Sequence, residues 1–142
     1  KIGISDSILN KPGALTKEEY DIIKQHPDIA YRIVSKIGLR ENVLKAIKHH
    51  HERCDGKGYP DMIKDGEIPI MASIISVADA FDAITSNRPY RKSRSMKQGI
   101  EEIVMHRGTQ FDSTVAETLE KAFLTKQDIL KKIYNDEEIE FF

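Results

Sequence analysis

The residues best suited to chemistry are three consecutive histidines that stand shortly before a turn containing two glycines and a proline, Gly56 to Pro60. The apolar residues preceding them recur at helical spacing: Val43, Leu44 and Ile47. Continuing this spacing reaches His50, His51 and Cys54, whereas His49 and Glu52 fall outside it. We therefore expect His50 and His51 to point toward the buried side and His49 to be solvated. A metal ion can serve as a common partner for two neighbouring buried imidazoles.

Two further residues are candidate metal ligands. His26 precedes Pro27 at a predicted corner between two helices, where its side chain is committed to neither packing face. Asp79 lies within a strongly apolar stretch, where an unpaired carboxylate is costly to bury. Adjacent residues of a helix diverge by about 100°, so we expect His50 and His51 to reach two metals rather than one. Mixed imidazole and carboxylate ligation favours iron, manganese or zinc over calcium or magnesium.

The basic segment that follows Asp79 suits a phosphate-containing substrate. Arg88, Arg91 and Lys92 can hold phosphates, and arginine offers bidentate contacts. Tyr59 and Tyr90 offer flat faces for a nucleobase. A two-metal centre supplies a nucleophile at neutral pH and stabilises displacement at phosphorus. These residues together indicate a nucleotide phosphodiesterase.

Helices must position these residues, and we predict an all-α fold of about six to seven helices without strands. Thr16 with Glu19, and Ser95 with Gln98, are capping boxes that begin helices. The segment from Pro69 to about Ser86 is apolar on nearly every side, so we expect a central helix packed all round. The other predicted helices cover 17–25, 27–38, 41–53, 95–106, a stretch beginning at 112 or 113, and a last one after residue 125.

Composition restricts the class of protein. The chain has 142 residues, enough for one domain with its own core, and its net charge of −1 gives no general attraction to nucleic acid polymers or anionic membranes. Its single cysteine excludes a disulfide framework and suits a reducing compartment. No apolar run reaches the roughly 18 residues of a membrane span, so we expect a cytoplasmic segment without membrane contact.

Several motifs together resemble the HD-GYP family, all-α bacterial phosphodiesterases that open cyclic di-GMP. The matching stretches are Lys1-Ile2-Gly3-Ile4, Ile8-Leu9-Asn10-Lys11-Pro12-Gly13, His26-Pro27, His50-His51-Glu52, Gly56-x-Gly58-Tyr59-Pro60, Val77-Ala78-Asp79-Ala80-Phe81-Asp82-Ala83 and Arg88-Pro89-Tyr90-Arg91. The resemblance implies a partial HD-domain-like helical bundle over residues 1–124. Residues 125–142 are then a C-terminal helix with an acidic tail.

The resemblance also implies roles for individual residues. His26, His50, His51 and Asp79 match the family's metal ligands, the same four that the residues themselves suggest. Lys1 matches a catalytic-site lysine at the substrate phosphate, and the substrate-binding positions are Tyr59, Arg88 and Arg91. The family's cofactors are two or three divalent metal ions, typically iron or manganese.

One feature of the family has no counterpart in this sequence. Its paired His-Asp ligands lie just upstream of the lysine that matches Lys1. We therefore expect a piece of a longer protein that lacks its N-terminal helices, exposes apolar surface and is itself weak or inactive. The longer protein is then a metal-dependent phosphodiesterase in second-messenger signalling, and an absent segment could anchor it to a membrane.

Two other functions are compatible with these residues. One is a non-catalytic signalling module that binds a cyclic dinucleotide or a partner protein. The other is a metal phosphohydrolase that acts on ordinary nucleotides. For the phosphodiesterase, the expected partners are a cyclic dinucleotide and either a signalling protein or an upstream sensory domain.

Overall fold

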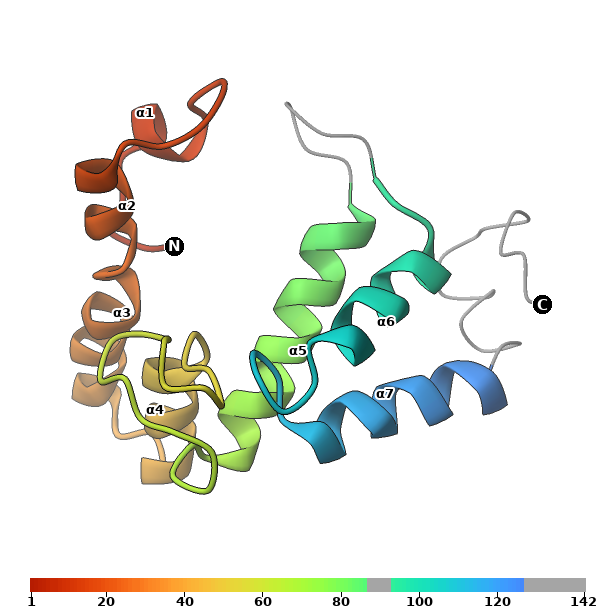
Figure 1. The fold of residues 1–142 in the computed structure, drawn as a ribbon. Helices are drawn as coiled ribbons and strands as arrows, with labels where there is room; N and C mark the ends of the chain where they lie inside the picture. The colour runs from red at the N-terminus through yellow and green to blue at the C-terminus, as the bar shows by residue number, and fades with distance from the viewer. Residues whose placement is uncertain (87–92, 127–142) are drawn as a thin grey trace.

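The computed structural model describes residues 1–86 and 93–126, and these ranges contain seven α-helices and no β-strand (Figure 1). The predicted all-α class is confirmed. The helices are α1 (Asp6–Leu9), α2 (Lys17–Ile23), α3 (His26–Val34), α4 (Glu41–His49), α5 (Ile70–Thr85), α6 (Met96–Met105) and α7 (Ser113–Thr125), with a short 3₁₀ turn over Ser35–Ile37. Arg88, Tyr90, Arg91 and Lys92 lie outside the described residues, as does all but Lys126 of the helix predicted after residue 125.

Local capping signals determine where several helices begin. Both predicted capping boxes are confirmed: the Thr16 hydroxyl accepts the Glu19 amide, and the Ser95 hydroxyl accepts the Gln98 amide. The Asp112 side chain caps α7 by accepting the amide of Val115 at 2.9 Å. Sequence therefore predicts these helix starts correctly, because each depends on residues only three positions apart.

Helix α5 runs between two groups of helices. α4 packs on one side of it, and α6 and α7 pack on the other (Figure 1). The main cluster of the core joins α5 to the segments of α6 and α7 through four buried residues: Val77, Ile103, Phe111 and Ala116. α3 packs against α4, so the corner before α3 and the end of α4 are held near one another.

The prediction that α5 is packed all round is wrong. Its buried residues are Ala72, Ser73 and Val77, whereas Ile70 and Ile74 are 57% and 52% exposed. Part of the apolar surface of α5 is thus left exposed in the described chain, which agrees with the expectation of exposed apolar surface. None of the helices in residues 1–86 and 93–126 combines the length and apolar character needed to cross a membrane.

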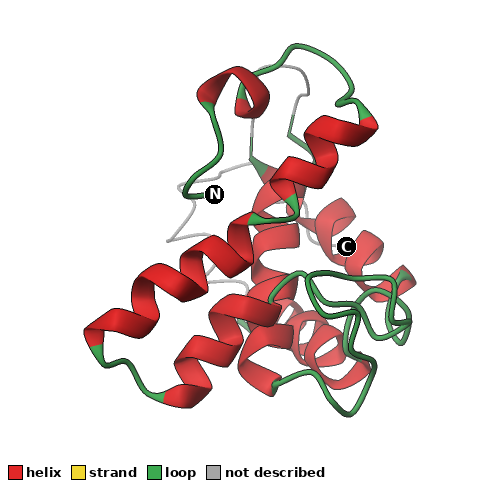
Figure 2. Cartoon of the chain, turned by 90° about the vertical axis from the view of Figure 1, so that its left-hand side faces the viewer, coloured by secondary structure: helices red, strands yellow, loops and turns green. Residues whose placement is uncertain are grey.

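A long irregular segment joins α4 to α5 and carries the glycine-rich motif (Figure 2). The predicted helix over 41–53 ends four residues early, at His49, with His50 as its C-cap. Likewise, α2 ends at Ile23 and α3 begins at His26, with Pro27 in its first turn. The corner between α2 and α3 and the end of α4 therefore each present histidines.

Candidate metal centre

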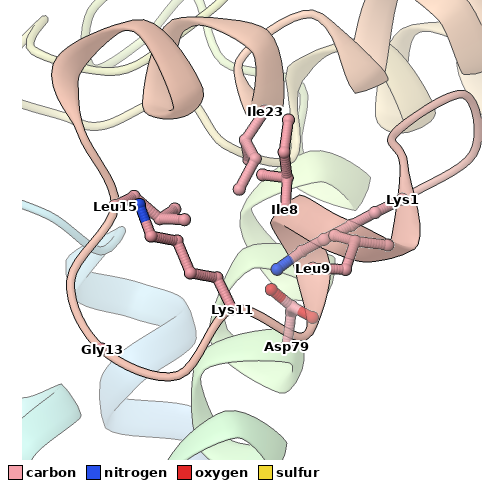
Figure 3. Close-up of a pocket in the computed structure, with 8 residues that line it drawn as sticks. All are labelled: Lys1, Ile8, Leu9, Lys11, Gly13, Leu15, Ile23 and Asp79. Atoms are coloured by element: carbon pink, nitrogen blue, oxygen red, sulfur yellow. The ribbon is translucent and has the colours of Figure 1, made fainter.

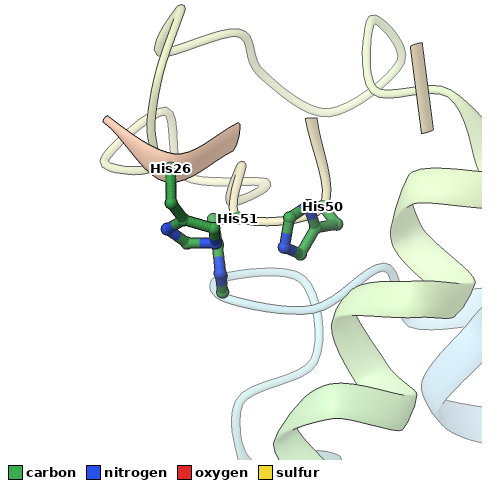
Figure 4. Close-up of side chains that lie close together, drawn as sticks. All are labelled: His26, His50 and His51. Carbon is green, nitrogen blue, oxygen red and sulfur yellow. The ribbon is translucent and has the colours of Figure 1, made fainter. Parts of the chain in front are cut away.

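Three of the four predicted metal ligands come together. One nitrogen from each of His26, His50 and His51 lies within 4.8 Å of the other two (Figure 4). The ring centroids are 4.1 Å apart for His50 and His51 and 4.9 Å apart for His26 and His51. His26 is 4% exposed, and the other two are half-buried. Residues 24 to 25 positions apart in sequence therefore form one compact cluster of imidazoles.

Backbone carbonyls fix the orientation of two of these rings. The His26 Nδ1–H donates to the carbonyl of Ile23 at 2.7 Å, and the His50 Nδ1–H donates to that of Ile47 at 2.8 Å. Because a carbonyl oxygen can only accept, the proton must sit on Nδ1 in each ring. The lone pair of the neutral imidazole then lies on Nε2. A hydrogen bond from the nitrogen that does not bind the metal is the usual support of a metal-binding histidine in proteins.

The surroundings also favour the neutral form of all three rings. Burial lowers the pKa of His26 and of His50, although a backbone hydrogen bond to each opposes this effect. Burial, together with the neighbouring His50 and His26, lowers the pKa of His51 to about 3. Only a neutral imidazole can ligate a metal. The cluster is thus in the protonation state that metal binding requires at neutral pH.

The prediction that His50 and His51 reach two different metals rested on their being adjacent in a helix. His50, the C-cap of α4, keeps helical backbone dihedrals of φ −68° and ψ −9°, yet the two rings lie close together, with their planes at 40°. Their nitrogens instead lie within reach of a single ion together with that of His26. Three converging neutral imidazoles are a donor set that fits a divalent transition metal.

The glycine-rich segment folds back onto the backbone that carries the histidines. Gly58 is buried so closely that a Cβ there would lie 2.5 Å from the Cα of Glu52 and from the nitrogen of Arg53. The Tyr59 amide donates to the His51 carbonyl at 3.2 Å. The Tyr59 ring stacks on that of His51, with centroids 4.9 Å apart and planes at 29°. Only glycine allows this approach, so the motif brings an aromatic ring against a candidate ligand.

Tyr59 was predicted to bind substrate, and the structure shows what its ring contacts in this chain. Besides stacking on His51, it lies edge-on to His26 and to Tyr20, each with centroids 6.4 Å away. Burial raises the pKa of the Tyr59 hydroxyl. One face of the ring is therefore occupied by a histidine, and its substrate-binding role stays a prediction.

Of the two residues that the helical pattern placed outside the buried stripe, Glu52 is in fact buried and His49 is half-buried. Glu52 is 3% exposed, and its Oε1 accepts the amide of Asp61 at 2.7 Å. The side chain of His49 is 13% exposed, and its Nε2 contacts the Asp61 carboxylate at 2.9 Å. The expectation of a solvated His49 is wrong, because the chain after α4 folds back over both residues. Cys54 is buried, as predicted.

Asp79 lies in a pocket beside the histidines rather than among them. This pocket has a volume of about 450 Å³ and is lined by Lys1, Ile8, Leu9, Lys11, Gly13, Leu15, Ile23 and Asp79 (Figure 3). The predicted burial of Asp79 in apolar surroundings is wrong, since the residue is exposed on α5. Its charge nevertheless raises the pKa of His50, opposing the larger effect of burial. Lys1 and Asp79, which are 78 positions apart, thus line one cavity.

Comparison with known proteins shows the family of the chain. The HD domain family matches residues 1–115. The chain belongs to the HD domain family. A cyclic di-GMP phosphodiesterase of Thermotoga maritima is 41% identical over 142 residues, covering 99% of this chain and 38% of its own length. The cyclic di-GMP phosphodiesterase response regulator RpfG of Xanthomonas campestris is 41% identical over 122 residues, covering 84% of this chain and 32% of its own length.

The HD-GYP resemblance is confirmed by these relatives, and the HD fold has a solved counterpart. A cyclic GMP-AMP-specific phosphodiesterase of Vibrio cholerae superposes with a TM-score of 0.61 at 18% identity, covering 91% of this chain and 36% of that one. The chain spans about a third of the length of the relatives it matches.

Proposed function

We propose that this chain carries the metal-binding core of a phosphodiesterase that hydrolyses a cyclic dinucleotide, with His26, His50 and His51 as metal ligands. The observation that carries the proposal is the convergence of three neutral imidazoles whose donor nitrogens lie within 4.8 Å of one another. HD-domain relatives named as phosphodiesterases of cyclic di-GMP and of 3'3'-cGAMP support the same reaction.

Asp79 is the proposed fourth ligand, because it is the acidic residue of the adjoining pocket and its charge already acts on His50. When bound, divalent ions activate water for attack at phosphorus and stabilise the negative charge that develops on the phosphate. Imidazole with carboxylate suits iron or manganese, and we propose two or three such ions at the complete site.

The pocket beside the histidines is suited to one half of a cyclic dinucleotide. Lys1 brings positive charge to a cavity that also holds the Asp79 carboxylate and whose other walls are largely apolar, whereas the Lys11 ammonium is ion-paired with Glu19 at 2.6 Å. A phosphate would face Lys1, and a nucleobase would cover the apolar side chains Leu9 and Leu15. Lys1 acts at the scissile phosphate in this arrangement, while Arg88 and Arg91 orient the phosphates and Tyr59 contacts the base. Cyclic di-GMP is the proposed substrate.

One observation favours a second candidate function. Within the described residues, the group whose donors converge contains histidines and no carboxylate. A module that binds a cyclic dinucleotide without cleaving it needs no second metal to activate water. Product analysis distinguishes the two functions.

The test compares two neighbouring histidines of the same chemistry. His50→Gln should abolish binding of Mn²⁺ or Fe²⁺ to the 142-residue chain, whereas His49→Gln should retain it, because His49 contacts Asp61 instead. Metal content is measured by elemental analysis, and hydrolysis of cyclic di-GMP and 3'3'-cGAMP is measured by chromatography on the protein as its gene encodes it. Retention of metal by His50→Gln would refute the proposed centre. Nucleotide binding without product, by a metal-loaded protein, would establish the binding module instead.

A further inference from the structure

Glu52 is the buried charged residue closest in sequence to the proposed ligands. It directly follows His51, and it is 3% exposed although it lies outside α4. Burying a carboxylate is costly, so its position needs a compensating contact. Its Oε1 accepts the backbone amide of Asp61 at 2.7 Å, nine residues further along the chain. The Glu52 carboxylate therefore holds Asp61, just after the glycine-rich motif, close to the histidines.

Two other contacts also join residues 58 to 61 to residues 51 to 53. Gly58 packs directly on the backbone of Glu52 and Arg53, and the Tyr59 amide donates to the His51 carbonyl. Residues 58 to 61 thus fold back over residues 51 to 53, and Glu52 fastens the far end. Between these attachment points lies Tyr59, whose ring stacks on His51 and meets His26 edge-on.

We propose that Glu52 is a positioning residue of the metal centre, acting through Tyr59. By holding the Asp61 amide, it keeps the Tyr59 ring against His51 and so limits rotation of that imidazole and access of water to it. His26 and His50 already have backbone carbonyls that orient their rings, at Ile23 and Ile47. Tyr59 supplies the corresponding constraint on His51. The role rests on the proposed metal function of the histidines and adds a specific cause for the orientation of one of them.

The variants that test this role separate the hydrogen bond from the charge and from the volume. Glu52→Met keeps most of the side-chain volume and removes the acceptor, whereas Glu52→Gln keeps an acceptor oxygen and removes the charge. Replacing a buried charge by an apolar residue is often tolerated by the fold. The matched control is Glu67→Met, because the Glu67 carboxylate also accepts a backbone amide, that of Lys64 at 3.1 Å, within the same loop. Glu67 is exposed and outside the histidine cluster.

The measurement is titration of the 142-residue chain with Co²⁺, read from the visible absorption bands that report ligand geometry, with far-UV circular dichroism on each variant. Glu52→Met should bind Co²⁺ about ten- to hundredfold more weakly than wild type and show altered bands, as loss of an outer support typically causes. Glu52→Gln and Glu67→Met should remain within about threefold of wild type.

Each alternative outcome decides a separate point. Wild-type affinity and wild-type bands in Glu52→Met would overturn the positioning role. Loss of helical circular dichroism in that variant would also overturn it, since the carboxylate would then support the fold as a whole. Weak binding by a folded Glu52→Gln would also overturn it, because that variant keeps the oxygen that accepts the Asp61 amide. A wild-type chain that binds no Co²⁺ would instead refute the proposed function.

Discussion

Replacing Gly58 by alanine should damage the metal centre without touching any ligand. The added Cβ would lie 2.5 Å from Glu52 Cα, 2.5 Å from Arg53 N and 2.7 Å from Glu52 C. All three atoms belong to the backbone, so no flexible side chain can move aside, and residues 58 to 61 must shift away from residues 51 to 53. That shift disrupts the hydrogen bond from the Tyr59 amide to the His51 carbonyl and the hydrogen bond from the Asp61 amide to Glu52. It also moves the Tyr59 ring away from His51.

The magnitude follows from those contacts. A neutral hydrogen bond contributes about 1 kcal/mol and one to a charged group about 1.5–3 kcal/mol. An aromatic pair adds about 0.5–1.5 kcal/mol. Since part of each contact survives relaxation, we expect Gly58→Ala to lower the free energy of unfolding by about 3 kcal/mol, within the range of severe single substitutions. Urea unfolding followed by circular dichroism measures this change. Metal affinity should fall about tenfold or more, because Tyr59 leaves His51.

Gly66→Ala provides the control for Gly58→Ala. Gly66 lies in the same loop with φ +83° and has no atom within 4 Å of an added Cβ. Its substitution should cost only the strain of a left-handed backbone, about 1 kcal/mol, and leave metal affinity unchanged. If Gly58→Ala unfolds within about 0.5 kcal/mol of wild type, or binds metal as tightly, the close approach does not position the site.

Three further predictions concern the fold and the metal. Ile103→Ala should lower the free energy of unfolding by about 3–4 kcal/mol in urea titrations, because Ile103 is 0% exposed at the centre of the core. Thr16→Ala should cost about 1 kcal/mol by loss of the α2 cap, which a Tm shift without any change in metal affinity would show. Chelation of the metal-loaded chain should lower its Tm, since an ion at a hundred times its Kd stabilises the fold by about 2.7 kcal/mol. An unchanged Tm after chelation would contradict the proposed centre.

Sequence predicts the helices of this chain better than their ends. The starts at Thr16, Ser95 and Asp112 are local, since each cap bonds a residue three positions on. The end of α4 is not local, because it depends on residues 58 to 61 folding back over residues 51 to 53. The helical spacing of apolar residues continues through His51, so it cannot predict a helix end that depends on this tertiary contact. The burial of Glu52 was missed for the same reason.

Sequence also predicts the types of site residue better than their surroundings. The three histidines were identified as a group and do converge. Asp79 was expected to be buried because its neighbours in α5 are apolar, yet it is exposed beside Lys1. Apolar residues on all sides of a helix show that every side can be buried, but they do not show which segments pack against each side. Side-chain burial in α5 depends on packing partners, whereas the capacity of a side chain to act as a ligand can be recognised from its residue type.

The two oriented histidines show how helix termination and the proposed metal ligation are connected in this fold. Ile23 is the last residue of α2, and Ile47 lies in the last turn of α4, so their carbonyls have no partner within the helix. His26 and His50 satisfy these carbonyls through Nδ1–H. The same bond that completes the helix end places the lone pair on Nε2, on the opposite side of the ring. The end of α2 and the end of α4 therefore each orient one imidazole, and these two rings converge with that of His51, the residue after His50.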